Sequence, residues 1–104
     1  MIDLDQVEGF EWDEGNERKS QERHAVSQGE AEQVFFSAPL FLLQDTKHTE
    51  SEPRFHALGK TEPGRLLHIT FTTMAEGKKI RVISARDMNR KERIVYEEKF
   101  ETDS

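Results

Sequence analysis

The stretches that decide the fold are RLLHITFTT, residues 65–73, and KKIRVISAR, residues 78–86. In both, apolar or β-branched residues alternate with polar ones, which is the period-two pattern of a strand with one buried face. A turn at Glu76-Gly77 separates them, so the pattern predicts antiparallel strands over 65–73 and 80–85. The residues expected to share one face of the second strand are Ile80, Val82 and Ser84.

Two more strands are predicted upstream. Residues 53–59 alternate in the same way and reach the 65–73 strand through KTEPG, whose Pro-Gly pair is typical of a turn. The short apolar run LFLL at 40–43 suits a buried strand, and the polar segment 45–53 between the two suits a loop.

The helices are predicted from capping residues and periodicity. A short strand at 9–12 precedes a polar surface helix over 13–24, which Asp13 would cap. Ser27 and Glu30 have the spacing of a capping box, and an amphipathic helix follows them up to Pro39. Asp87 is expected to cap a C-terminal helix of about a dozen residues.

This order predicts one α+β domain over residues 1–104, with a core at about 9–98 and a flexible tail at 99–104. The expected architecture is an antiparallel sheet with two N-terminal helices and one C-terminal helix, all packed on one face of the sheet.

Composition excludes several classes of protein. The chain has 104 residues and no cysteine, which excludes a disulfide framework, a thiolate zinc site and a cysteine nucleophile. Its four histidines show no metal-ligand spacing, and its glycines form no nucleotide-binding fingerprint, so neither a metal nor a cofactor is expected. The acidic N-terminus is unlike a targeting peptide, and no run is apolar enough to span a membrane, which predicts a cytoplasmic protein.

Charge is unevenly distributed along the chain. The formal net charge is -6, which argues against a protein that holds polyanions. Residues 78–93, however, carry seven basic residues against Asp87 and Glu92. This block is either an ordinary solvated face or a phosphate-binding face, and both interpretations stay open.

With those classes excluded, the candidates for a chemical role are arginines and residues that can carry a proton. The arginines are Arg54, Arg81, Arg86 and Arg93, and the possible proton carriers are His24, His56 and Glu92. Guanidinium groups bind phosphates through paired hydrogen bonds, and the 2′-hydroxyl of RNA is a built-in nucleophile, so such a set could cleave RNA without a metal. Structural roles stay open beside this one: His24 as a helix-end residue, Glu92 as an ion-pair partner and Tyr96 as a core residue.

The sequence also resembles a known family, the BrnT ribonuclease toxins of bacterial type II toxin-antitoxin systems. The resemblance runs from about Gly9 to Glu98. It is carried by Phe10-Glu11-Trp12-Asp13, Arg23-His24, Val26-Ser27, Glu30-Ala31, Val34-Phe35, Pro39, Glu52-x-Arg54, Ala57-x-Gly59 and Gly64-Arg65-Leu66-Leu67. Its most specific part is Arg81-Val82-Ile83-Ser84-Ala85-Arg86 followed by Glu92-Arg93-x-x-Tyr96.

The resemblance implies a RelE-like fold and an endoribonuclease toxin that cleaves RNA and inhibits translation. It also implies a BrnA-like antitoxin as partner in a hetero-oligomer. The residues implied for catalysis are His24, Arg54, Arg86 and Glu92, with the two arginines binding phosphate and His24 or Glu92 transferring protons. The residues implied for RNA binding are Arg81, Ser84, Arg93 and Tyr96.

The chain departs from the family pattern in its first helix. Asn16 stands where the family usually has lysine, and Ala25 where it usually has glycine, the residue best suited to a left-handed helix end. The alternative function is therefore a weakened BrnT-like module that docks its antitoxin or RNA without cleaving it.

Overall fold

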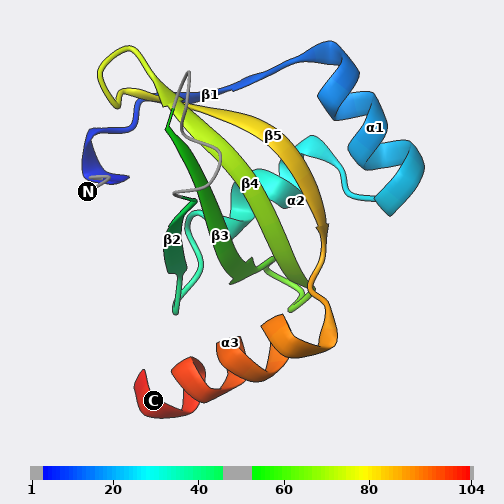
Figure 1. Cartoon of the computed structure of the whole chain (residues 1–104), viewed down its shortest axis with the longest axis vertical. Helices are drawn as coiled ribbons and strands as arrows, with labels where there is room; N and C mark the ends of the chain where they lie inside the picture. Colours follow the sequence, from blue (N-terminus) through cyan, green and yellow to red (C-terminus); the bar gives the residue numbers. More distant parts are fainter. Residues whose placement is uncertain (1–3, 46–52, 104) are drawn as a thin grey trace.

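The computed structural model describes residues 4–45 and 53–103, which form three α-helices and a five-stranded sheet (Figure 1). In chain order the elements are the 3-10 turn η1 (Leu4–Gln6), β1 (Gly9–Trp12), α1 (Glu14–His24), α2 (Gln28–Val34), β2 (Phe41–Asp45), β3 (Arg54–Lys60), β4 (Leu66–Met74), β5 (Lys79–Asp87) and α3 (Arg90–Asp103). Residues 46–52 of the expected polar loop lie outside the described residues. The described helices include none that is both long and apolar enough to cross a membrane.

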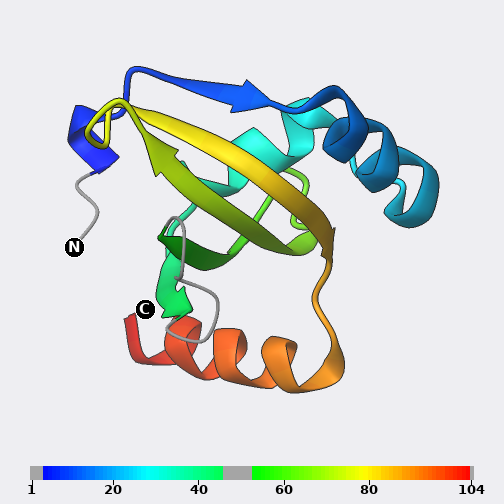
Figure 2. The ribbon, with the colours of Figure 1, turned by 45° about the horizontal axis from the view of Figure 1, so that its top comes forward.

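The sheet is mixed rather than antiparallel, which corrects the expectation. Its strand order is β1-β5-β4-β3-β2, and the predicted hairpins β3–β4 and β4–β5 are confirmed. β1, however, pairs parallel to β5, with Gly9 beside Lys79 and Trp12 beside Val82, and it forms one edge of the sheet (Figure 2). This pairing joins segments about 70 residues apart, so no turn signal in the sequence could announce it.

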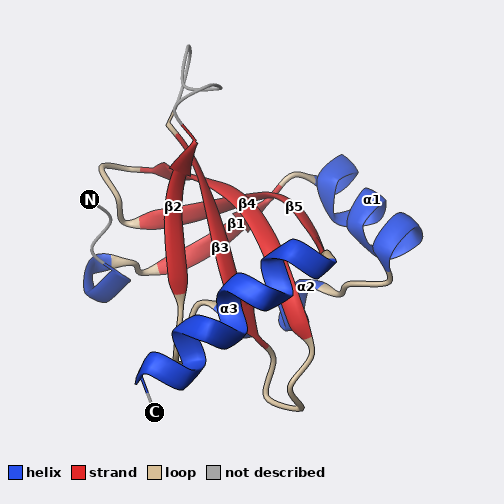
Figure 3. Ribbon diagram, turned by 60° about the horizontal axis from the view of Figure 1, so that its bottom comes forward, coloured by secondary structure: helices blue, strands red, loops and turns tan. Residues whose placement is uncertain are grey.

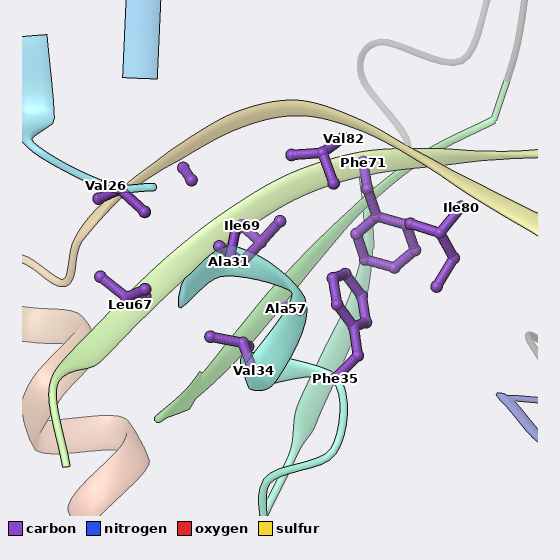
Figure 4. Close-up of a cluster of buried hydrophobic side chains, with 11 residues drawn as sticks. Val26, Ala31, Val34, Phe35, Ala57, Leu67, Ile69, Phe71, Ile80 and Val82 are labelled. Atoms are coloured by element: carbon purple, nitrogen blue, oxygen red, sulfur yellow. The ribbon is translucent and has the colours of Figure 1, made fainter. Parts of the chain in front are cut away.

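The main core lies between the sheet and α2. Ser27 caps α2 through the predicted capping box, and Ala31 and Val34 of this helix are fully buried. Phe35 follows the helix and packs edge-on against Phe71 of β4, with ring centroids 5.0 Å apart (Figure 4). The buried residues of this cluster are Val26, Ala31, Val34, Phe35, Ala57, Leu67, Ile69, Phe71, Ile80, Val82 and Ala85.

The helices cover both faces of the sheet, not one as expected. α3 crosses the face opposite α2 (Figure 3). There Met88 and Tyr96 pack on Leu58 of β3 in a second, smaller core, and the Tyr96 hydroxyl donates a hydrogen bond to the Pro39 carbonyl (2.7 Å). The apolar residues at this end of the second face require a cover, and α3 supplies it.

A β-bulge changes the face on which Ser84 lies. Thr70 of β4 pairs with Ser84, but the next residue, Phe71, pairs with Val82, so β5 has one extra residue at this point. Ser84 therefore shares the face of Thr70 rather than that of Ile80 and Val82, which corrects the expected alternation.

α1 is attached to the sheet edge by polar contacts. Asp13 caps it as predicted, and the helix ends at Ala25 in a left-handed conformation (φ 53°, ψ 37°). The buried Ser20 hydroxyl oxygen accepts a hydrogen bond from the backbone N–H of Ala85 in β5 (3.2 Å). These contacts position α1 although its sequence is almost entirely polar.

α3 begins later and ends later than expected. Its capping residue is Asn89, not Asp87: the Asn89 side-chain oxygen accepts from the Glu92 N–H, and Glu92 Oε1 accepts from the Asn89 N–H (both 2.9 Å). Asp87 is the last residue of β5 and binds Arg65 instead. The helix continues to Asp103, through most of the segment expected to be a flexible tail.

Candidate functional site

The face of the sheet that α3 crosses, called here the outer face, carries a polar cluster beside the start of α3. Strand register places its members on this face. His56 pairs with Thr70, Thr70 with Ser84, and His68 with Arg86, and side chains of paired residues lie on the same side of a sheet. Glu92, in the first turn of α3, closes the cluster from above.

Arg86 and Glu92 form its central ion pair. The guanidinium donates from Nη1 to Glu92 Oε1 (2.8 Å) and from Nη2 to Glu92 Oε2 (2.9 Å), a bidentate arrangement. The Arg86 side chain is 35% exposed and that of Glu92 is 18% exposed. Arg86 is thus accessible to solvent although its carboxylate partner is largely covered.

Two histidines extend the pair into a chain of contacts across three strands. His68 Nδ1 lies 2.6 Å from Glu92 Oε2 and 3.0 Å from Arg86 Nη2. His68 Nε2 lies 2.9 Å from His56 Nδ1, and His56 Nε2 lies 3.0 Å from Asp45 Oδ2. The Thr70 hydroxyl also contacts His56 Nδ1 (3.1 Å). The result is an unbroken carboxylate–histidine–histidine–carboxylate chain.

These contacts shift the acid–base properties of the cluster. Burial alone would raise the pKa of Glu92, but hydrogen bonds from Arg86, the Asn89 N–H and His68 lower it to about 2. Burial lowers the pKa of His68, opposed by Glu92 and reinforced by the charge of Arg86. Glu92 is therefore a carboxylate near neutral pH, so a proton held at this site sits on an imidazole nitrogen and not on Glu92.

Arg54 lies at the start of β3 on the same face. It is two residues before His56 and pairs with Asp45 of β2. Its Nε is buried and has no hydrogen-bond partner among residues 4–45 and 53–98. A buried donor without a partner is uncommon and suits a group that meets a ligand.

The structure brings together four of the eight residues predicted from the sequence. They are Arg54, Ser84, Arg86 and Glu92, all on the outer face or directly above it. Arg81 lies further along β5 on this face, opposite Thr72, with its Nη2 3.9 Å from Asp13 Oδ2.

His24, Arg93 and Tyr96 do not join this cluster. Tyr96 is 2% exposed and belongs to the core, the structural role that the sequence left open. His24 ends α1 near Asp87, whose pKa is lowered by hydrogen bonds from Arg65 and by the nearby charges of His24 and Arg93. Asp87 pairs with Leu67 of the main core and so lies on the other face of the sheet.

Arg65 organises this second group, and its role is structural. Its guanidinium binds Asp87 through both carboxylate oxygens (2.8 and 3.0 Å) and Glu30 (3.1 Å). It also donates to the backbone carbonyls of His24 (3.0 Å) and Ala25 (2.8 Å) at the end of α1. Arg65 thereby fixes the α1–α2 connection to the end of the sheet.

Sequence reasoning missed Asp45 and His68 as site residues, and considered His56 only as a possible proton carrier. A signal was available, because His56 and His68 both lie at polar positions of predicted neighbouring strands. Only the register, however, shows that they are diagonal neighbours with ring centroids 4.9 Å apart. In the described part of the chain, no group of histidine and acidic side chains is arranged to hold a metal ion.

Comparison with known proteins identifies the family. The family model for the ribonuclease toxin BrnT of type II toxin-antitoxin systems matches residues 12–92. The chain belongs to the BrnT family. This BrnT family member is also similar in fold to the crystal structure of the Brucella abortus ribonuclease toxin BrnT, with a TM-score of 0.58 and 20% sequence identity over 79% of this chain and 97% of that one. No curated protein matches its sequence.

The family match covers most of the outer-face cluster. It includes Arg54, His56, His68, Arg86 and Glu92, and it ends at Glu92 in the first turn of α3. The three helices and mixed sheet agree with the BrnT fold. The family thus supplies the class of activity, ribonuclease toxin, and the geometry supplies the residues from which a site in this chain can be argued.

Proposed function

We propose that this BrnT family member is a metal-independent endoribonuclease toxin whose cleavage of RNA inhibits translation. The observation that carries the proposal is the position of Arg86 on the outer face: its side chain is 35% exposed and contacts His68, which in turn contacts His56. This combination offers a phosphate-binding guanidinium and proton-exchanging groups in one place, which RNA cleavage through the 2′-hydroxyl needs.

In the proposed reaction the 2′-hydroxyl loses its proton to solvent while O2′ forms a bond to phosphorus. The bond between phosphorus and O5′ breaks, and O5′ takes up a proton, leaving a 2′,3′-cyclic phosphate and a 5′-hydroxyl. Arg86 and Arg54 balance the charge that develops on the phosphate oxygens. The histidine pair supplies the proton to O5′, because Glu92, with a pKa of about 2, carries none near neutral pH.

The remaining parts of the proposal follow from the family. The partner is a BrnA-like antitoxin that forms a hetero-oligomer with this chain, and the site of action is the cytoplasm, where translated RNA is found. Arg81 and Ser84 lie on the outer face with Arg86 and extend the RNA-binding surface along β5. His24 and Arg93 lie near Asp87 and outside the outer-face cluster, so the proposed reaction gives them no step.

The test is cleavage of a structured RNA by the antitoxin-free full-length chain in excess chelator. Arg86→Ala is compared with Arg18→Ala, which removes an exposed arginine of α1. We expect wild-type protein and Arg18→Ala to leave cyclic-phosphate ends, and Arg86→Ala to be slower by about 100-fold or more. Circular dichroism confirms that each variant is folded. Equal cleavage by Arg86→Ala would contradict the placement of the site, and cleavage only after metal is restored would contradict metal independence.

One observation favours the alternative, a module that binds antitoxin or RNA without cleavage. Glu92 binds Arg86 through both carboxylate oxygens, so without RNA the positive charge of Arg86 is already neutralised. Intact RNA in the presence of folded wild-type protein, with ribosomes both absent and added, would contradict cleavage and favour this second function.

A further inference from the structure

Two neutral imidazole rings carry too few N–H hydrogens to make every contact of the histidine chain a hydrogen bond. The three contacts of the chain join Asp45 to His56, His56 to His68, and His68 to Glu92, and each needs one hydrogen. Ionised carboxylates contribute none, and two neutral imidazoles contribute only two. All three contacts are satisfied together only when the pair holds one additional proton and one positive charge.

Two groups compete for the same nitrogen of His68. Nδ1 lies 3.0 Å from Arg86 Nη2, which can only donate, and 2.6 Å from Glu92 Oε2, which can only accept. When His68 is neutral with its proton on Nε2, Nδ1 accepts from Arg86. When His68 is protonated, Nδ1 donates to Glu92 and can no longer accept from Arg86. The charge on the histidine pair therefore decides whether His68 engages one N–H of Arg86.

We propose that the outer face is a proton-coupled phosphate site, in which the His56–His68 pair takes up one proton as Arg86 turns an N–H from His68 to a phosphate oxygen of RNA. The inference rests on the proposed function and adds its regulation: the site binds RNA more tightly as the pH falls. Two effects act together. Protonation frees a donor on Arg86, and it adds one positive charge beside the phosphate.

Charged and polar groups from every neighbouring element determine the direction of this effect. Glu92 of α3 and Asp45 of β2 favour the protonated pair, whereas Arg86 of β5 and Arg54 of β3 oppose it, and the Thr70 hydroxyl contacts His56. Burial lowers the pKa of His68 from its ordinary 6.5, which favours the neutral form of this ring in the free protein. A bound phosphate adds negative charge and shifts the pair toward its protonated form.

The experiment measures the affinity for a 2′-O-methyl oligouridylate, which cannot be cleaved through O2′ and whose phosphodiesters do not titrate in this range. Fluorescence anisotropy compares about pH 5.5 with about pH 7.5. We expect the wild-type chain to bind about tenfold more tightly at the lower pH. His68→Gln should lose most of this pH dependence, and Arg18→Ala should keep it. All three proteins retain His24 and His48, so the comparison isolates the contribution of His68.

A second measurement does not depend on RNA. Nitrogen-15 NMR of the imidazole rings should show the signals of His56 and His68 moving together with one midpoint, because the two rings share one proton. Separate titrations of the two rings would overturn the inference. So would Arg86-dependent binding with equal pH dependence in wild type and His68→Gln, although RNA binding itself would stand. Absence of binding at both pH values would instead remove the proposed RNA site and this inference with it.

Discussion

At the scale of single residues, Glu92 is the most connected side chain of the site. It accepts hydrogen bonds from both terminal nitrogens of Arg86 and from the Asn89 N–H, and it contacts His68. One carboxylate thus caps α3, holds the central arginine and ends the histidine chain. Its loss should affect the stability of the fold as well as the site, and the effect on stability should depend on pH.

Glu92→Gln should lower the free energy of unfolding by roughly 1–3 kcal/mol at neutral pH, because the half-buried ion pair with Arg86 loses its negative charge. The pKa of Glu92 falls from 4.5 to about 2 on folding, so its contribution is complete above pH 4.5 and is lost as the pH falls toward 2. Urea unfolding from neutral to acid pH should show the wild-type and Glu92→Gln curves converging over that interval. Glu97→Gln, an exposed substitution in α3, should run parallel to the wild type. A constant difference between wild type and Glu92→Gln at all pH values would contradict this account.

Ala25 adopts a backbone conformation that is unfavourable for alanine and favourable for glycine. It ends α1 in the left-handed region, at φ 53°, where a Cβ atom is strained and glycine is not. Ala25→Gly should therefore raise the free energy of unfolding by about 0.5–1 kcal/mol. Arg23→Gly, inside the same helix, should lower it by about 1 kcal/mol. Thermal melts of the two variants should shift in opposite directions, and a loss of stability in Ala25→Gly would show that the strain lies elsewhere.

At the scale of elements, the close approach of α2 to β3 depends on Gly59. A Cβ atom at this position would lie 2.6 Å from the Ser37 hydroxyl and 2.8 Å from a methyl of Val34. Gly59→Ala should cost about 1–3 kcal/mol, the usual cost of overpacking a well-packed core. Gly29→Ala, in the open on α2, should instead gain about 1 kcal/mol through helix propensity. Denaturant midpoints measure both changes, and equal midpoints for the two variants would refute the proposed contact.

The elements that the sequence predicts well are those with local signals. Asp13 and the Ser27–Glu30 capping box locate both N-terminal helices, and alternation with short turns locates the hairpins of β3, β4 and β5. In each case the interacting residues lie within a few positions of one another or across one turn. The order of residue types alone is therefore enough to locate these elements.

The elements that escaped prediction depend on contacts distant in sequence. The parallel pairing of β1 with β5 and the placement of α3 opposite α2 both join segments far apart in the chain. A bulge in β5 places Ser84 on the outer face. The sequence gives no sign of it before Ala85, because the alternation that begins at Ile80 continues unbroken to Ser84. Asp87 precedes α3 with the right chemistry for a cap but is bound by Arg65 instead.

The site was half predictable for the same reason. Arg86 and Glu92 are six residues apart at a strand-to-helix junction, and the resemblance to BrnT toxins marked both. His68 and Asp45 join the site through strand register, and the polar position of His68 in a predicted strand is the only signal for either in the sequence. The catalytic role of His24 came from the resemblance, and in the structure His24 ends α1 near Asp87, outside the outer-face cluster.

At the scale of the whole molecule, an acidic chain carries a basic segment over β5 and the start of α3. The net charge of -6 opposes the approach of RNA at long range, whereas residues 78–93 attract it at short range. Salt screens exposed charges that lie more than a Debye length apart, so it weakens both the long-range repulsion and the long-range attraction of RNA. Direct contacts between arginines and phosphates still release counterions when RNA binds. RNA affinity should therefore depend on few contacts rather than on a broad positive surface.

The salt dependence of RNA binding measures that number. With Arg54, Arg81 and Arg86 contacting phosphates, a plot of log affinity against log salt should have a slope of about −2, at roughly −0.7 per contact for single strands. Arg81→Ala should reduce the magnitude of this slope by about 0.7 without moving the cleavage position, because its phosphate contact positions the strand and reads no base. Arg18→Ala should leave the slope unchanged. A slope near −5 would show that RNA follows a wider surface than the outer face, and an unchanged slope in Arg81→Ala would place the bound strand away from the start of β5.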